Sequence, residues 1–340
     1  MPAKRYNTFN RSKKTGIIMA GTVQGLIEFV LTKHIHKAAP SLDLKKKAKI
    51  IAAHFNDLKV FLSATEKDFS SIKFVGGETL DLNKKDIEFI KEIQISKLIS
   101  PKLNAQQNLC KIATEIFIKR QLAMISVLTL DNLNCNPILI SALRLQTPNE
   151  VVKFYTFQAV GRSIVTSLGF LVQDLLLYSG ENIYDANTED SVIGGTKWDL
   201  VKQKAGEIKA WIEVKSGPND LDKAQILHYK KAIEVIEEKG EKGYIGETYG
   251  KRTTKTITHG LYKQYLPNWE KRTLIGTELW DFISDDPSYH EKLIILLTDT
   301  AGVFLGDHSL VEVIEGKVKE LTKTFEKEHK SVSKFMETLW

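Results

Sequence analysis

Two short β-prone runs decide the fold of this chain: Lys197-Trp198-Asp199-Leu200-Val201 and Lys209-Ala210-Trp211-Ile212-Glu213-Val214-Lys215-Ser216-Gly217. Gly206 lies in the polar segment between them, which is typical of the turn of an antiparallel hairpin. Side chains alternate along a strand, so Glu213 and Lys215 are expected on one face. If the hairpin pairs in this way, Asp199 comes alongside them. The sequence therefore predicts two carboxylates and one ammonium around a single point.

Such a set of side chains suits phosphodiester chemistry. Mg²⁺ prefers hard oxygen ligands, is usually held by one or two carboxylates, and completes its shell with water and phosphate oxygens. A neighbouring lysine can orient or deprotonate the attacking water and stabilise the charge that builds on phosphorus. The competing interpretation is an exposed hairpin whose charges are merely solvated. Trp211, Ile212 and Val214 argue against it, because an exposed strand does not usually carry three such residues together.

Asp199, followed fourteen positions later (213 − 199) by Glu213-Val214-Lys215, resembles the signature of the PD-(D/E)xK nucleases, with Trp198 where the family name has proline. The resemblance implies an α/β fold: a mixed sheet of four or five strands flanked by helices, with a helical N-terminal region. It implies Mg²⁺-dependent in-line attack of water on a DNA phosphodiester, leaving a 5′-phosphate and a 3′-hydroxyl. Asp199 and Glu213 would hold the metal, the Val214 carbonyl would add a ligand, and Lys215 would position the water.

Length and composition set the outer limits of the interpretation. With 340 residues, 42% of them hydrophobic, the chain can bury a large core and is expected to hold one large domain plus a smaller one. A net charge of +6 is compatible with nucleic acid without establishing it. Cys110 and Cys135 are the only cysteines, which argues against a disulfide scaffold and a Cys-rich zinc site and favours a reducing compartment. The histidines show no ligand spacing, which disfavours an HNH nuclease.

The basic N-terminus superficially resembles a secretory signal, but Gln24 and Glu28 interrupt its apolar run, so an amphipathic helix is expected there. No stretch approaches about 18 uninterrupted apolar residues, so no membrane span and no membrane partner are expected. These features favour a cytoplasmic protein.

Residues 1–105 are expected to be mostly helical, with helices over Thr22–Ala39 and Leu44–Leu62 and another from Asn83. The Gly-rich segment Lys73–Gly77 before the last of these is either part of a helix-hairpin-helix that binds the DNA backbone or an ordinary interhelical loop. A role of this region in DNA-backbone binding or dimerisation is expected, with residues 106–340 forming the nuclease domain.

Helical patterns dominate the residues before the hairpin. A long helix is expected over 106–130, one opens at Pro148 and runs through Val160, and a further one spans Arg162–Tyr178. In the superfamily that the hairpin resembles, the last helix before the hairpin often brings another polar residue to the metal. Gln173 and Asp174 on that helix, and Gln225 on the helix expected over Ala224–Glu238, are therefore predicted accessory residues.

After the hairpin, Tyr244–Gly250 is expected to be the next core strand, Leu293–Leu297 a buried helix or strand, and the stretch from Glu312 to the end a charged amphipathic helix. The basic loop after Tyr244–Gly250 can hold backbone phosphates or reach guanine in the major groove; the alternative is a merely soluble loop. The predicted DNA contacts are Lys251, Arg252, Thr254, Lys255, Ser216 and Asn219. His259 is expected to be a DNA or surface contact rather than a catalyst.

A narrower resemblance joins four blocks in order: Asn136–Leu139, Pro148–Phe170, the hairpin, and Ile275–Ile283. Together they resemble type II restriction endonucleases of the PmeII and MjaII kind over roughly residues 105–300. The resemblance implies cleavage of double-stranded DNA at a short palindrome, of the GGNCC type, by a two-fold symmetric homodimer. It also implies a prokaryotic cytoplasmic enzyme, with a cognate DNA methyltransferase that acts on the same site but need not bind the nuclease.

Two alternatives stay open. One is a repair or recombination nuclease with the same core that recognises DNA structure instead of sequence. The other is a DNA-binding protein with a decayed nuclease core, which the intact Asp199, Glu213 and Lys215 disfavour.

Overall fold

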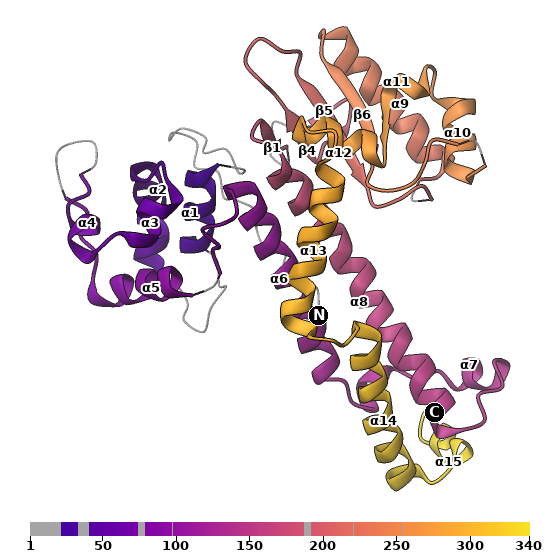
Figure 1. Ribbon diagram of the computed structural model, residues 1–340. Coiled ribbons are helices and arrows are strands. Elements are labelled where there is room, and N and C mark those ends of the chain that lie inside the picture. Colours follow the sequence, from indigo (N-terminus) through magenta and orange to yellow (C-terminus); the bar gives the residue numbers. More distant parts are fainter. Residues whose placement is uncertain are drawn as a thin grey trace. The chain divides into compact units, whose positions relative to one another are not determined.

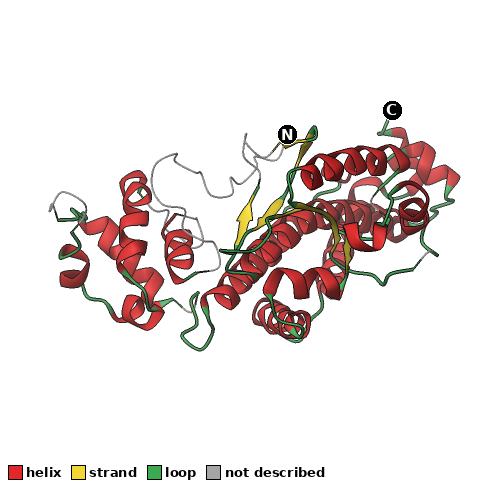
Figure 2. Ribbon diagram, turned by 90° about the horizontal axis from the view of Figure 1, so that it is seen from above, coloured by secondary structure: helices red, strands yellow, loops and turns green. Residues whose placement is uncertain are grey.

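The computed structural model describes residues 22–32, 41–73, 79–96, 98–186, 192–219, 221–253 and 255–340. Helices make up most of the described chain, and the strands form a small part of it (Figure 2). Two compact units are present: Met1–Ile112 with Val172–Leu296, and Ala113–Leu171 with Leu297–Trp340. The predicted division at residue 105 into a helical region and a nuclease domain stays a prediction.

A five-stranded mixed sheet is the centre of the first unit, in the order β1-β4-β5-β6-β7. Its strands are β1 (Ile183–Asp185), β4 (Leu200–Lys202), β5 (Ala210–Lys215), β6 (Lys242–Glu247) and β7 (Thr273–Ile275). The pairs β1/β4 and β4/β5 are antiparallel, whereas β5/β6 and β6/β7 are parallel. A mixed sheet flanked by helices confirms the predicted α/β fold class.

The predicted hairpin exists, with one correction. β4 and β5 pair antiparallel, with Leu200 opposite Ile212, and Gly206 in the turn has φ +81°, a conformation that glycine adopts without strain. The first predicted strand, 197–201, is wrong in its extent. Lys197 belongs to β3 (Thr196–Lys197), which pairs with β2 (Val192–Ile193) in a separate two-stranded sheet. Asp199 therefore lies just before β4, where two short strands meet.

Helices cover both faces of the sheet, and Figure 1 shows α9, α10, α11 and α12 gathered around its strands. One face packs on α9 (Lys223–Glu238), α10 (Ile257–Tyr265) and α11 (Trp269–Arg272), through a core that includes Trp211, Ile233 and Tyr262. On the other face α12 (Thr277–Ser284) brings Leu279 against Ile212 and Gly246, where an added Cβ on the glycine would lie 3.0–3.1 Å from both side chains. Both faces of β5 are thereby shielded from water.

The crossover from β5 to β6 positions the site. Helix α9 begins at a capping box in which Asp222 and Gln225 each accept a hydrogen bond from the other's backbone N–H, at 2.9 and 3.0 Å. Its buried face, including Ile226, Tyr229 and Ile233, repeats at the helical period and packs on the sheet. The helix predicted over 224–238 is confirmed, and the strand predicted at 244–250 is β6, which ends earlier, at Glu247.

The second unit is entirely helical in its described residues. It takes in parts of α6 (Ala105–Ser126), α8 (Pro148–Ser179) and α13 (Tyr289–Leu305), with α7 (Pro137–Ala142), α14 (Leu310–His329) and α15 (Val332–Glu337). Its core includes Tyr155, Leu133, Val318 and Phe325.

Several predicted elements here need correction. Helix α8 is continuous over 32 residues, so the predicted break between Val160 and Arg162 is wrong: Gly161 is tolerated within the helix. Leu293–Leu297 is helical, but the prediction that it is buried fails at Ile294 and Ile295, each 61% exposed. Two stretches, Pro148–Ser179 and Tyr289–His329, reach the length and hydropathy of a membrane span, a criterion that helices of soluble proteins also meet.

The N-terminal part contains five described helices: α1 (Val23–Thr32), α2 (Leu42–His54), α3 (Leu58–Ser63), α4 (Glu66–Ser70) and α5 (Lys84–Ile95). Side-chain caps at Ser41, Asp57 and Asn83 explain where α2, α3 and α5 begin. The predicted helix 44–62 is two helices, because Phe55 and Asp57 adopt extended backbone between them. All of the Gly-rich segment considered for a helix-hairpin-helix except Lys73 lies outside the described residues.

Candidate active site

The hairpin brings Asp199 and Glu213 side by side. Because Leu200 lies opposite Ile212 in the antiparallel register, Asp199 falls next to Glu213 on the neighbouring strand. Oδ2 of Asp199 accepts a hydrogen bond of 2.9 Å from the backbone N–H of Val214, which fixes the carboxylate against β5. The structure therefore places the two predicted carboxylates at the same end of the hairpin.

The two carboxylate oxygens of Glu213 differ in their hydrogen bonding among the described residues. Its Oε1 accepts hydrogen bonds from Nζ of Lys215 at 2.8 Å and from the hydroxyl of Tyr229 at 2.7 Å. Its Oε2 is buried and has no hydrogen-bond partner among the described residues. Lys215 Nζ also lies 5.1 Å from the centre of the Tyr229 ring. A buried carboxylate oxygen without a donor is costly unless a cation or water binds to it.

Burial and charge shift the protonation of this cluster. Burial first, and the Glu213 carboxylate second, raise the pKa of Asp199 to about 7. Burial alone would lower the pKa of Lys215, but the charge of Glu213 and the hydrogen bond to it outweigh burial and raise that pKa. Burial, followed by the charge of Glu213, raises the pKa of Tyr229 to about 12. Lys215 is thus an ammonium at neutral pH, suited to positioning and neutralising charge rather than to accepting a proton.

Metal-free protein is expected to lose stability as the pH rises from about 4 to about 7, because the folded state binds the Asp199 proton more tightly than the unfolded state does. Each pKa unit corresponds to about 1.4 kcal/mol, so the loss amounts to a few kcal/mol at most. Asp199→Asn should remove this slope and unfold at higher denaturant concentration than wild type at pH 8, but not at pH 4. Urea unfolding in EDTA measures it. Equal pH dependence in the two proteins would contradict the raised pKa.

The residues present fit a divalent cation. Oε2 of Glu213 lacks a donor, and the half-buried carboxylate of Asp199 is a second hard-oxygen ligand beside it. In the described part of the chain no cluster of three or more His, Cys, Asp or Glu side chains is placed to hold a metal. The protein would therefore supply two carboxylates, and carbonyl, water or phosphate oxygens would complete the shell, a pattern typical of Mg²⁺.

The predicted accessory residues have different surroundings. Nε2 of Gln173 on α8 lies 3.5 Å from Oδ1 of Asp199, at the outer limit of a hydrogen bond. Asp174 adds to the raised pKa of Cys110, which is chiefly due to burial, so its charge lies near that thiol. Gln225 is exposed and closes the capping box of α9. Accessory roles for these three residues stay predictions.

Tyr229 is a member of the cluster that sequence reasoning missed. It lies on the buried face of α9, and the tyrosine within that apolar stripe was the available signal. Tyr229→Phe is expected to lower the cleavage rate about 10- to 100-fold, as loss of an outer partner of a metal ligand typically does, and to raise the Mg²⁺ concentration for half-maximal activity. Single-turnover cleavage against Mg²⁺ concentration measures both.

Tyr244→Phe is the matched control. Tyr244 packs on Phe282, so this substitution also removes a tyrosine hydroxyl, but one that lies away from Glu213. Unchanged Mg²⁺ dependence in Tyr229→Phe would mean that the hydrogen bond to Glu213 has no part in orienting it.

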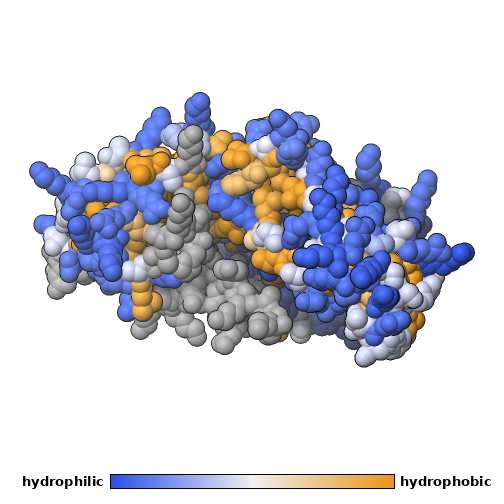
Figure 3. Space-filling model, turned by 90° about the horizontal axis from the view of Figure 1, so that it is seen from below, coloured by the Kyte–Doolittle hydropathy of each residue, from blue (hydrophilic) through white to orange (hydrophobic). Residues whose placement is uncertain are grey.

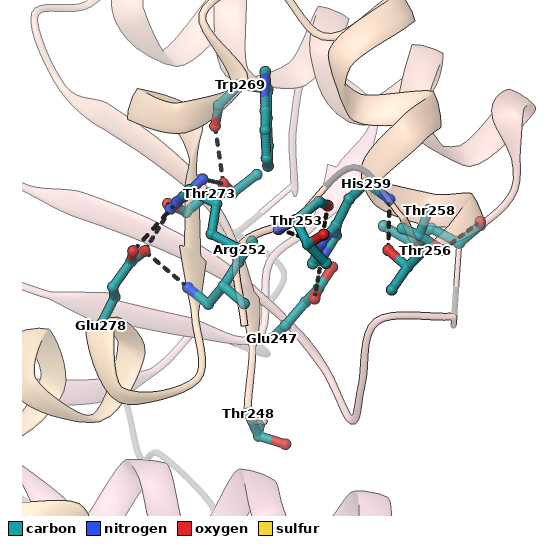
Figure 4. Close-up of polar contacts among 12 residues, drawn as sticks. Glu247, Thr248, Arg252, Thr253, Thr256, Thr258, His259, Trp269, Thr273 and Glu278 are labelled. Atoms are coloured by element: carbon teal, nitrogen blue, oxygen red, sulfur yellow. Dashed lines mark hydrogen bonds and ion pairs between the residues drawn. The ribbon is translucent and has the colours of Figure 1, made fainter. Parts of the chain in front are cut away.

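The predicted DNA contacts divide into exposed and engaged residues. Lys251, Lys255 and Asn219 are exposed, Ser216 is half-buried, and Thr254 lies outside the described residues. Arg252 is engaged internally: its guanidinium donates to Oγ1 of Thr273 at 2.8 Å, to the Thr273 carbonyl at 3.1 Å and to both carboxylate oxygens of Glu278 (Figure 4). A DNA contact by Arg252 would require it to leave these partners, and all six contacts stay predictions.

His259 is not a surface residue, and the expectation that it contacts DNA or solvent is wrong. Its ring is fully buried, with Nε2 2.7 Å from Oε2 of Glu247 and Nδ1 2.8 Å from the carbonyl of Thr253 (Figure 4). Glu247 ends β6 directly opposite Lys215 in the parallel register. The pair therefore lies behind the candidate site and anchors the loop that leaves β6.

Comparison with known proteins bears on the same part of the chain. A family model described as type II restriction endonuclease EcoO109I matches residues 105–303, which is more than half of the chain. No curated protein matches the chain. The matched segment contains the whole hairpin, α9 and the loop after β6.

Proposed function

The chain belongs to the family of the type II restriction endonuclease EcoO109I, and on this premise we propose that it makes site-specific double-strand breaks in DNA at a short palindrome. The observation that carries the proposal is the meeting of Asp199, Glu213 and Lys215 at one end of a hairpin, with Oε2 of Glu213 buried and lacking a donor. Two carboxylates that can bind a divalent cation, beside an ammonium, are a combination suited to phosphodiester hydrolysis.

In the proposed reaction Asp199 and Glu213 would hold Mg²⁺, with the Val214 carbonyl as a further ligand. Bound there, the ion supplies positive charge to the scissile phosphate and makes water more acidic. Tyr229 and Lys215 keep Oε1 of Glu213 occupied and so direct Oε2 toward the ion. The Lys215 ammonium orients the attacking water and neutralises charge on the phosphate in the transition state. Water attacks in line, leaving a 5′-phosphate and a 3′-hydroxyl.

Duplex DNA is proposed to lie across the edge where β5 and β6 end. Ser216 and Asn219 follow β5, and Lys251, Arg252, Thr254 and Lys255 follow β6, and the two strands are parallel neighbours. Lysine and hydroxyl groups at such an edge suit backbone phosphates, which fix register without reading sequence. Exposure of Lys251, Lys255 and Asn219 supports this placement.

A homodimer is proposed, because one nuclease core cuts one strand and a palindrome has two-fold symmetry. Exposed apolar side chains in the second unit support an interface there: Val165 is 73% exposed, Phe170 48% and Val303 74%. Figure 3 shows hydrophobic residues, in orange, lying among hydrophilic ones, in blue, on the face in view. Residues 1–105 are proposed to bind the DNA backbone or to take part in dimerisation. Light scattering on purified protein tests the dimer.

The finer assignments are proposals of the same kind. We assign the chain to the PmeII and MjaII group, with a GGNCC-type target and a cytoplasmic location in a prokaryotic cell. A cognate methyltransferase would modify the same site and need not bind the nuclease. Each of these assignments rests on membership of the family alone. For the target sequence in particular, the residues that read bases lie on loops that vary independently of the core.

Digesting a plasmid with purified protein and Mg²⁺, and sequencing the fragment ends, tests the proposed function. Discrete fragments that share one palindrome, with 5′-phosphates, are expected. Cutting only at junctions or ends would point instead to a structure-specific nuclease. Binding of duplex DNA without nicking would point to a decayed core. Target, stagger and end chemistry come from the same reaction.

A further inference from the structure

Tyr249 is an exposed aromatic residue two positions after β6, outside the cluster of Asp199, Glu213 and Lys215. Its side chain is 60% exposed, yet its ring lies directly on the backbone of Gly217. A Cβ added to Gly217 would be 2.3 Å from the Tyr249 hydroxyl and 2.4 Å from Cζ of the ring. Gly217 follows Lys215 by two residues, so the hydroxyl sits beside the end of the strand that carries Glu213 and Lys215.

The residue before Tyr249 ties this loop to the same strand. The backbone N–H of Thr248 donates to the carbonyl of Lys215 at 3.2 Å, and its hydroxyl donates to the carbonyl of Ser216 at 2.7 Å. The carbonyl of Thr248 accepts a hydrogen bond of 2.8 Å from the indole of Trp280. Three hydrogen bonds thus fix the backbone from which the tyrosine projects.

Further hydrogen bonds hold the far side of the loop as well (Figure 4). The Glu247–His259 pair binds the carbonyl of Thr253, and Arg252 is clamped by Thr273 and Glu278. Gly276 donates its N–H to the Glu247 carbonyl at 2.8 Å and has no room for a side chain, since a Cβ there would lie 2.4 Å from the Gly250 carbonyl oxygen. Tyr249 and Lys251, which lie between these anchors, are exposed to solvent.

We propose that the Tyr249 hydroxyl donates a hydrogen bond to a DNA backbone phosphate next to the scissile phosphodiester, which makes it a substrate-binding residue. This rests on the proposed function. A tyrosine hydroxyl is a common phosphate donor, and its pre-fixed ring loses little conformational freedom on binding. The packing of the Tyr249 ring on Gly217 also explains why position 217 is a glycine, because only a residue without a side chain lets the ring lie against the end of β5.

Tyr249→Phe tests the hydroxyl, because it removes only that group. Tyr249→Ala, measured in parallel, removes the ring as well. Hydrogen bonds to charged groups contribute about 1.5–3 kcal/mol, which corresponds to roughly a 10- to 100-fold rise in Kd for a duplex that carries the cleavage site. Fluorescence anisotropy in EDTA measures Kd without cleavage. Both variants should lose affinity to a similar extent, while the single-turnover rate at saturating DNA changes less than Kd. Tyr265→Phe, a half-buried tyrosine on α10, is the matched control.

A double-mutant cycle tests the contact itself. Gly217→Ala should displace the Tyr249 ring and weaken DNA binding about as much as Tyr249→Ala does. In the Tyr249→Ala background the same Gly217→Ala change should have little further effect, because nothing is left to displace. Additive losses in Kd would overturn the proposed contact.

The outcomes separate the two proposals. If wild-type protein neither binds nor cuts duplex DNA, the proposed function fails. If it does both, and Tyr249→Phe binds as tightly as wild type, the hydroxyl assignment fails while the proposed function stands. Loss of affinity in Tyr249→Ala alone would likewise overturn the hydroxyl contact, in favour of packing by the ring. Circular dichroism of each variant establishes that it is folded.

Discussion

Glu213→Gln and Lys215→Ala are each expected to reduce DNA cleavage by at least about 10³-fold while leaving the fold intact and DNA binding largely intact. Gln keeps the shape of Glu213 and its bond from Tyr229 but removes the charge that a divalent cation requires. Ala at 215 removes an ammonium placed where charge develops, and loss of such a group typically costs 10²–10³-fold or more. Single-turnover cleavage of a plasmid, with DNA binding measured in parallel, checks both variants.

The hairpin carries its own matched controls. Glu207 and Lys204 lie in its turn, are exposed, and form an ion pair of 3.3 Å with each other. Glu207→Gln and Lys204→Ala therefore remove the same charges from the same hairpin, away from the site. They should cleave at the wild-type rate, because an exposed pair contributes little to stability. Wild-type cleavage by Lys215→Ala would refute the role given to that residue.

Removing divalent cations is expected to have the second large effect. In EDTA the protein should still bind duplex DNA but not cut it, and excess Mg²⁺ should restore cleavage. A readout independent of activity follows from the two neighbouring carboxylates: Mg²⁺ should raise the melting temperature, because a ligand that binds only the folded state stabilises it by mass action. Differential scanning fluorimetry at pH 8 across a Mg²⁺ series measures the shift.

Asp199→Asn separates this site from adventitious binding of cations. The variant should melt higher than wild type in EDTA at pH 8, since it lacks the carboxylate charge that its surroundings and Glu213 disfavour, and should gain little from Mg²⁺. Glu207→Gln should respond to Mg²⁺ as wild type does, and sodium chloride of equal ionic strength should not reproduce the shift. An equal response in Asp199→Asn and wild type would place the cation elsewhere.

The hairpin was predictable because its signals are local. Alternation fixed the faces of β5, Gly206 marked the turn, and a spacing of fourteen residues brought 199 beside 213. The extent of the first strand was wrong because Lys197 pairs with Val192 in a second small sheet. That pairing is a local hairpin across Gly194-Gly195, both with positive φ, and this two-glycine turn is a signal in the sequence that was overlooked.

Residues that meet through the crossover were harder to predict. Tyr229 reaches Glu213 only after α9 has folded back on the sheet. His259, fully buried here, looked like a surface residue because the loop before it is basic and polar. Arg252 looked like a phosphate ligand because the sequence gives no sign that Thr273 and Glu278 occupy its guanidinium. Contacts between distant segments decide these roles, so composition and periodicity cannot assign them.

Strand β5 has an antiparallel neighbour on one side and a parallel neighbour on the other, and this arrangement has a bearing on divergence. The carboxylates come from a tight hairpin, whereas the loop that starts at Thr248 arrives by way of a whole helix and another strand. Insertions between its anchored ends, Thr248 and Thr253, can accumulate while the pairing of the hairpin stays intact. Relatives that grip the DNA backbone differently are thus expected to differ in the loop and to keep the hairpin, and grafting the loop between them offers a route to altered affinity for DNA.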